Sequence, residues 1–309
     1  MSISSRRVDI PALLPTSTEL LNRFQDDDSS LGELAELIQL DPSLTSKLLR
    51  MANSAFFGMG GRVSSIEEAM TVVGLANTRG FVLADVLMGQ FKKDPWSQMN
   101  LKEFWTTSLC MGCTCSVLAL RAALPPDPVL MVIPANPANS LVGEVLPPAA
   151  DAPPRPAVSP NVAFSVGLLH RIGVLVLSAS LGEKYRDLLK ERLPNDELVQ
   201  RERSMFDTDH AKVGSELLRY WNLPAAIVDS VGMQYQAKDE LAPNMLVEIL
   251  RCGHDLSEGV RKERALEFDA LQGLHTGLFT INHDNFDKTV RMIKSKYKDL
   301  FHMVQGEAT

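Results

Sequence analysis

The chain has 309 residues, of which 45% are hydrophobic, so it can bury the core of one large domain or of two modest ones. Its net charge of −7 at pH 7 and its pI near 5.5 exclude a general binder of nucleic acids or of anionic membranes, because both need a basic surface. An aromatic content of 6% also argues against a protein that stacks on bases.

The apolar stretches of the chain are those of a soluble protein. Arg6 and Arg7 have no apolar run behind them, so we expect no signal peptide. The longest apolar tract, 163–181, holds His170 and Arg171 near its middle. Because a charge at mid-span is costly in lipid, this tract is predicted to be a buried core helix and not a membrane span. We therefore expect a cytoplasmic protein.

The first forty residues are predicted to form a short lead-in and two short helices. Pro11 and Pro15 block a long helix in residues 1–15. Amphipathic segments follow at 16–24 and 31–40, separated by an acidic turn.

The stretch 41–58 has the clearest helical pattern in the chain. Asp41 can cap the first free amides, and Pro42 suits the first turn, where no amide donor is needed. Apolar residues then recur every three or four positions, and Gly58 is a natural stop. The apolar positions are Leu44, Leu48, Leu49, Ala52, Ala55 and Phe56. We interpret this stretch as a packed scaffold helix without chemistry of its own.

Helices are also predicted for the rest of the N-terminal half. Ser65 and Glu68 fit a capping box, in which each side chain satisfies an amide near the other residue. A helix to about Val73, a turn at Gly74 and a helix through Gln90 should follow, and then a long helix over 102–124. No stretch alternates with a period of two, so no strand is expected.

The two segments DPSLTSKLLRMANSAFFG (41–58) and SIEEAMTVVGLANTRGFVLADVL (65–87) resemble the HDOD domain, an all-helical relative of the HD phosphohydrolases. The resemblance covers about 11–120 and 161–236. It implies an all-α, multi-helix HD-like bundle over residues 11–236, with 237–309 as a C-terminal helical extension packed on the same domain.

The window 125–160 interrupts the helical pattern, since it contains eleven of the chain's 18 prolines. Such density forbids helix and favours extended backbone. We interpret it as a loop insertion, because the family pattern resumes directly after it. A proline-rich ligand for another protein, centred on Pro153–Pro156, is the alternative.

The remaining chain is predicted to be helical to its end. The expected helices cover residues 161–180, 183–193, 196–205, 209–221, 224–236, 243–259 and 286–303.

The cysteine cluster CMGCTC invites a zinc interpretation. At about 100° per helical residue, however, Cys110 and Cys113 share a face while Cys115 points away from Cys113. With no nearby histidine to complete a ligand set, we expect buried thiols, Cys252 included, in a reducing compartment.

The resemblance also indicates which positions would correspond to the metal ligands of an HD enzyme. Catalytic HD phosphohydrolases hold metal ions with a histidine on one helix, an adjacent His-Asp pair on a second, and later His or Asp ligands, which together activate a water. The corresponding positions here are Thr107, His170, Arg171, His210 and Gln234, with Tyr235 beside the last.

This set predicts a vestigial pocket with no metal, no cofactor and no catalytic residue. Arg171 replaces the aspartate, and a fixed positive charge opposes a cation directly. We expect His170 to be a core histidine bonded to a carbonyl or a carboxylate. His210 follows a natural helix cap at 207–209. The other histidines are scattered without ligand spacing, at positions 254, 275, 283 and 302.

A non-catalytic signal-transduction module is the leading hypothesis, acting through regulatory protein partners or by sensing a small ligand. HDOD proteins are associated with bacterial signalling, including cyclic-di-GMP networks, and nothing favours nucleic acid or membrane as a partner. The sequence does not give the oligomeric state.

Two other functions stay open. A metal-dependent phosphohydrolase acting on a nucleotide or cyclic dinucleotide would need ligands such as Asp229, Glu216 or Asp209. A nucleotide sensor would use Arg171 to contact phosphate.

Overall fold

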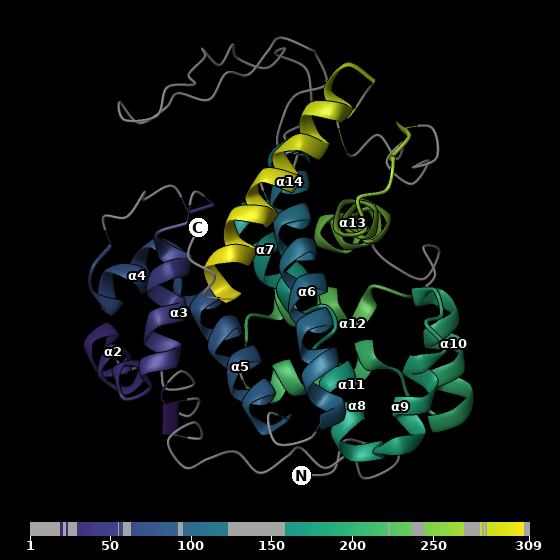
Figure 1. Cartoon of the computed structure of the whole chain (residues 1–309), viewed down its shortest axis with the longest axis horizontal. Coiled ribbons are helices and arrows are strands. Elements are labelled where there is room, and N and C mark those ends of the chain that lie inside the picture. Colours follow the sequence, from purple (N-terminus) through teal and green to yellow (C-terminus); the bar gives the residue numbers. More distant parts are fainter. Residues whose placement is uncertain are drawn as a thin grey trace.

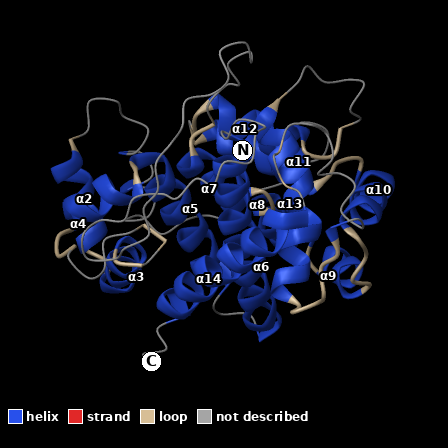
Figure 2. Cartoon of the chain, turned by 90° about the horizontal axis from the view of Figure 1, so that it is seen from above, coloured by secondary structure: helices blue, strands red, loops and turns tan. Residues whose placement is uncertain are grey.

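The structure is a computed structural model of the whole chain. The described residues are 30–54, 56–57, 63–91, 95–122, 158–221, 223–236, 244–268, 279, 281 and 283–305, together with Glu19, Leu20 and Arg23. Throughout these ranges the regular elements are helices, and no strand occurs among them (Figure 2). The proline-rich window 125–160, except for its last three residues, and six of the nine residues of the predicted helix 16–24 lie outside the described residues.

Four helices from the first part of the chain lie on one side of the molecule (Figure 1). They are α2 (Leu31–Gln39), α3 (Pro42–Ala52), α4 (Ile66–Val73) and α5 (Leu75–Phe91). Local capping explains the starts of α2 and α3: Ser30 and Glu33 form a complete capping box, and Asp41 accepts the amides of Ser43 and Leu44 at 2.9 and 3.1 Å. Gly74, with φ at +88°, makes the predicted turn between α4 and α5.

Helix α3 ends earlier than its apolar pattern predicts. It stops at Ala52, six residues before Gly58. The Asn53 side chain donates to the carbonyl of Val63 at 2.8 Å and accepts its amide at 2.9 Å. These two bonds stabilise a turn in place of further helix, so the prediction of a helix continuing toward Gly58 was wrong.

The long helix α6 (Pro95–Ala122) and the buried helix α7 (Pro160–Leu169) form the centre of the bundle. Two C-terminal helices, α13 (Met245–Arg261) and α14 (His283–Gln305), pack against α6, and α14 also reaches α3 (Figure 1). The core therefore joins segments from the two ends of the sequence.

The apolar tract predicted as a single helix is broken in two. Helix α7 ends at Leu169 and α8 (Ile172–Leu181) begins three residues later, so His170 and Arg171 occupy the break. By length and composition Pro160–Leu181 could cross a membrane, but 83% of its most apolar window is buried inside the fold, as in a core helix.

Four further helices pack around α8 and the C-terminal end of α7, on the opposite side from α2–α4 (Figure 1). They are α9 (Glu183–Lys190), α10 (Asn195–Phe206), α11 (His210–Tyr220) and α12 (Ala225–Met233). A Cβ on Gly173 would lie 2.0 Å from the carbonyl oxygen of His210, and one on Gly167 would lie 2.6 Å from that of Met111. The two glycines that flank the break therefore allow close contacts between helices.

The four cysteines are free and buried. Burial raises the pKa of the Cys110 thiol to about 12, with smaller opposing effects from the Arg261 charge and a hydrogen bond with Thr114. Inert core thiols fit this environment.

Candidate functional site

His170 lies at the break between α7 and α8 and is almost fully buried. Its Nδ1 atom lies 2.7 Å from the carbonyl oxygen of Gly167, so this nitrogen carries the proton and donates it. Its own carbonyl accepts a bond of 2.9 Å from the side chain of Gln234. His170 is thus the carbonyl-bonded core histidine that the sequence predicts. Burial, with the nearby charges of His254 and Arg171, lowers its pKa well below the ordinary value.

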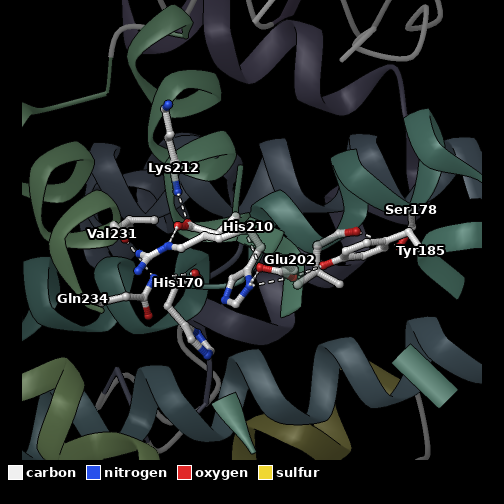
Figure 3. A network of polar contacts seen from close by, with 11 residues as sticks. His170, Ser178, Tyr185, Glu202, His210, Lys212, Val231 and Gln234 are labelled. Atoms are coloured by element: carbon white, nitrogen blue, oxygen red, sulfur yellow. Dashed lines mark hydrogen bonds and ion pairs between the residues drawn. The ribbon is translucent and has the colours of Figure 1, made fainter. Parts of the chain in front are cut away.

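His210 is the first residue of α11, placed by the cap that precedes it. Asp209 accepts the amide of Lys212 at 2.8 Å and pairs with Arg203 at 2.7 Å. The His210 ring faces Glu202 of α10, and its Nδ1 lies 2.8 Å from Oε2 of that carboxylate (Figure 3). The proton on Nδ1 is therefore held by Glu202, and Nε2 is left for another partner.

Glu202 is a fully buried acid whose bonds are all made within the protein. It accepts the backbone amide of His210 at 2.9 Å and a bond from the hydroxyl of Tyr185, besides the bond to the imidazole. Burial raises the pKa of Glu202, but the His210 charge and these hydrogen bonds outweigh it, so the pKa lies below the usual value. The carboxylate is thus stabilised as an anion inside the core.

Two ring side chains from other elements complete a group of rings, in which one pair is stacked and two pairs meet edge to face. The centroid of His254 on α13 lies 5.5 Å from that of His170 and 5.5 Å from that of Tyr235. Tyr235, in the turn after α12, lies 5.3 Å from His210 in an edge arrangement. We call these four residues, His170, His210, Tyr235 and His254, the histidine cluster. His254 was not among the predicted site residues, and its ring contacts bring it to them.

Asn195 at the start of α10 fixes the protonation of His254. Its side-chain nitrogen lies 3.1 Å from Nδ1 of His254 and donates to it. The neutral ring therefore carries its proton on Nε2. Burial lowers the pKa of His254 to about 3, and the charges of Arg171 and His210 add to this effect.

The turn that carries Tyr235 is fixed by Arg251 of α13. The Arg251 guanidinium donates to the carbonyl of Gln234 at 3.2 Å and to the carbonyl of Gln236, and it pairs with Glu248 at 2.9 Å. Arg251 therefore links α13, which carries His254, to the main chain of the turn that carries Tyr235.

Arg171 brings a fixed charge to the cluster. The residue is half-buried. Its charge adds to the lowering of the pKa values of His170 and His254 by burial, and it offsets part of the rise that burial causes in the pKa of Tyr235. Five buried atoms here have no hydrogen-bond partner: Arg171 Nε, His210 Nε2, Gln234 Oε1, Tyr235 Oη and His254 Nε2.

Thr107 is the predicted site residue that the contacts do not join to the others. Thr107 stands on α6 between Glu103 and Met111, which contact Arg261 and Gly253 of α13. The structure brings together the other four: His170, Arg171, His210 and Gln234.

The residues present do not fit the metal ions of HD enzymes. Glu202 already accepts three hydrogen bonds, and Arg171 opposes a cation. Nowhere in the described part of the chain are three or more His, Cys, Asp or Glu side chains placed to share an ion. The alternative ligands are no better placed, since Asp209 caps α11 and Asp229 pairs with Arg219 at 3.5 Å.

Glu202 was not predicted as a site residue, although the sequence contains a signal for it. Glu202 is four residues from both Leu198 and Phe206, so it stands on the apolar face of its helix. His254 has a similar signal, four residues after the buried Leu250. A polar residue on an apolar stripe therefore marks both.

A sequence profile of the HDOD domain matches residues 10–132 and 153–237. The chain belongs to the HDOD domain family. The residues left unmatched between these ranges fall inside the proline-rich window. An uncharacterised Treponema pallidum (strain Nichols) protein is 26% identical over 249 residues, which are 78% of this chain and 41% of that protein. The chain thus spans less than half the length of this relative.

Solved structures share the fold of this HDOD chain. A Shewanella amazonensis protein provisionally named a phosphohydrolase matches with a TM-score of 0.65 and 19% identity, over 95% of this chain and 94% of that one. A Marinobacter aquaeolei protein provisionally named a signal transduction protein has a TM-score of 0.60 and 17% identity, over 99% and 62%. An HDOD domain protein of Geobacter sulfurreducens has a TM-score of 0.54 and 18% identity, over 96% and 88%. These likenesses confirm the all-α, HD-like fold class.

Proposed function

We propose that this HDOD chain is a non-catalytic regulatory module of bacterial signal transduction, which works in the cytoplasm through contact with protein partners or by sensing a small ligand. The observation that carries the proposal is Arg171, a cation at the position where HD enzymes place a carboxylate, with its charge acting on His170 and His254. Components of cyclic-di-GMP signalling are the class of partner we propose first.

The chemistry of the cluster supports binding over hydrolysis. An HD-type reaction needs carboxylates and neutral imidazoles around a divalent cation. Glu202, the acid bonded to His210, already accepts hydrogen bonds from Tyr185 and His210. What remains is a set of hydrogen-bonding groups beside a guanidinium, which suits recognition of a polar ligand.

Elemental analysis together with a hydrolysis assay tests this proposal. We expect purified protein without stoichiometric iron, manganese or nickel, and no release of phosphate from nucleotides or cyclic dinucleotides when these metals are added. Stoichiometric metal with turnover that His170→Ala and His210→Ala both abolish would establish the phosphohydrolase instead.

Capture from the native cell tests the contact itself. We expect the folded chain to retain a specific partner at native expression, while the same chain unfolded by heat before immobilisation retains none. Failure to recover any specific partner or ligand with the folded chain would count against a regulatory module.

A further inference from the structure

The unpartnered polar atoms of the histidine cluster and Arg171 are grouped in one place. The His210 side chain is fully buried and yet its Nε2 has no partner, although Glu202 has fixed the other nitrogen (Figure 3). A buried polar atom without a partner costs about 1–3 kcal/mol, so four of them in one group require an explanation. A ligand that bonds to all four provides one.

Three of the four atoms belong to groups that can donate. Because Asn195 donates to Nδ1 of His254, the neutral His254 ring presents an N–H at Nε2. Arg171 Nε always carries a proton, and the Tyr235 hydroxyl can donate freely. Donors beside a fixed positive charge select an anion.

The fourth atom adds a requirement of its own. His210 donates from Nδ1 to Glu202, so without a second proton its Nε2 is a lone pair that accepts a hydrogen bond. A suitable anion therefore either shares an acidic proton with His210 or binds together with one.

The residues of the cluster differ in burial. His210 and Glu202 are fully buried, whereas Arg171, Tyr235 and His254 are part-buried as whole residues, although their unpartnered atoms are buried. His210 therefore lies on the more deeply buried side of the cluster.

We propose that Arg171, His210, Tyr235 and His254 bind a phosphate group, most favourably a phosphomonoester or inorganic phosphate. This inference deepens the proposed function and rests on its ligand-sensing form. The several oxygens of phosphate can accept from Arg171, Tyr235 and His254, while its ionisable oxygen shares a proton with His210. A phosphodiester lacks that proton, so His210 must take one from solvent to bind it.

Calorimetric titration of the full chain tests the site. The probes are inorganic phosphate, a nucleoside monophosphate and a cyclic dinucleotide, in buffer of constant ionic strength with chloride as the only other anion. We expect saturable binding with one site per chain, tighter for a monoester than for the cyclic dinucleotide. Tyr235→Phe and Arg171→Gln should each weaken binding about tenfold or more, because each removes a hydrogen bond to a charged ligand.

Matched surface variants control for the loss of a hydroxyl and of a charge. Tyr220 is exposed, and Arg219 pairs with Asp229 on the surface. Tyr220→Phe and Arg219→Gln should leave the dissociation constant within about twofold of wild type. Thermal unfolding of every variant confirms that it is folded, and Tyr235→Phe keeps the test valid if Arg171→Gln does not fold.

Two results would overturn the phosphate site. One is a folded wild-type chain that binds none of the three probes at millimolar concentration, and the other is affinity that Tyr235→Phe and Arg171→Gln both leave unchanged. Either result, obtained with a chain that still captures a protein partner, would remove this site and leave the regulatory function standing. Binding followed by hydrolysis of the probe would support the site and overturn the non-catalytic function.

Discussion

Nδ1 of His210 lies 2.8 Å from Oε2 of Glu202, and neither side chain is exposed to solvent. The bond joins the start of α11 to the middle of α10, and Tyr185 of α9 donates to the same carboxylate. Three helices are therefore held together by a single acid. Its removal should affect the fold as well as the orientation of the imidazole.

Glu202→Gln should lower the free energy of unfolding by about 2–4 kcal/mol, because the amide nitrogen cannot accept the bonds that a carboxylate oxygen accepts. Tyr185→Phe removes one of the three donors and should cost about 1–2 kcal/mol. Urea denaturation measures both. The exposed Glu191, which pairs with Arg201 at 3.6 Å, is the control, and Glu191→Gln should change stability by less than about 0.5 kcal/mol. Equal effects at positions 202 and 191 would contradict the role of the buried acid.

Gly173→Ala should destabilise the protein by about 3 kcal/mol, because the new methyl group would meet the backbone of α11. The exposed helical Gly32 has only Ser30 Oγ near its Cβ position, at 3.9 Å. Gly32→Ala should therefore stabilise the chain by about 0.5–1 kcal/mol. Opposite shifts of the melting temperature are expected, and a neutral Gly173→Ala would show that the two helices can separate without cost.

Stability should fall as the pH drops from about 6.5 toward 5. His170 and His254 have lowered pKa values in the folded chain, so below the ordinary histidine pKa of 6.5 the unfolded chain binds more protons than the folded one. Each pH unit then costs up to about 1.4 kcal/mol for each histidine that stays neutral. Urea denaturation at a series of pH values measures the slope.

His254→Asn tests this assignment, since asparagine keeps an acceptor for Asn195 but does not titrate. The slope between pH 6.5 and 5 should become shallower by about 1.4 kcal/mol per unit. A variant with the wild-type slope would mean that His254 is protonated in the folded protein over this range.

Arg251→Ala should loosen the turn that carries Tyr235. The variant loses the bonds to the carbonyls of Gln234 and Gln236, at a cost of about 1–2 kcal/mol. Faster amide hydrogen exchange is expected in residues 234–236. Arg251→Lys keeps the charge but not the two-pronged geometry, so its exchange rates should lie between the two. Exchange that is unchanged in the alanine variant would show that other contacts hold the turn.

Local signals in the sequence were enough to predict the helical fold and several of its boundaries. Asp41 and Gly74 act through their immediate neighbours, and the predicted cap and turn were confirmed. The early end of α3 was not predictable in this way, because Asn53 bonds to Val63, ten residues away. The break at His170 has a similar cause, since Gln234 donates to its carbonyl from sixty-four residues away.

The site was predicted only in part, again because some of its contacts join residues that are far apart in the sequence. His170, Arg171, His210 and Gln234 match positions of the HD pattern, which fixes their places along the chain. Glu202 and His254 do not belong to that pattern, and only the packing of α10 and α13 brings them to the cluster. Their signal is local but ambiguous, because a polar residue on an apolar stripe can also snorkel to the surface.

Gly167, where α7 crosses α6, and Gly173, where α8 crosses α11, restrict how the centre of the molecule can respond to a signal. Gly167 fits against α6 and Gly173 against α11, each too close for even one added carbon. Helices α7 and α8 are therefore fixed in register with α6 and α11 and cannot slide lengthwise. A change of shape on ligand capture is therefore easier in the turn after α12 than at these two crossings, so a partner would detect that turn and not the centre.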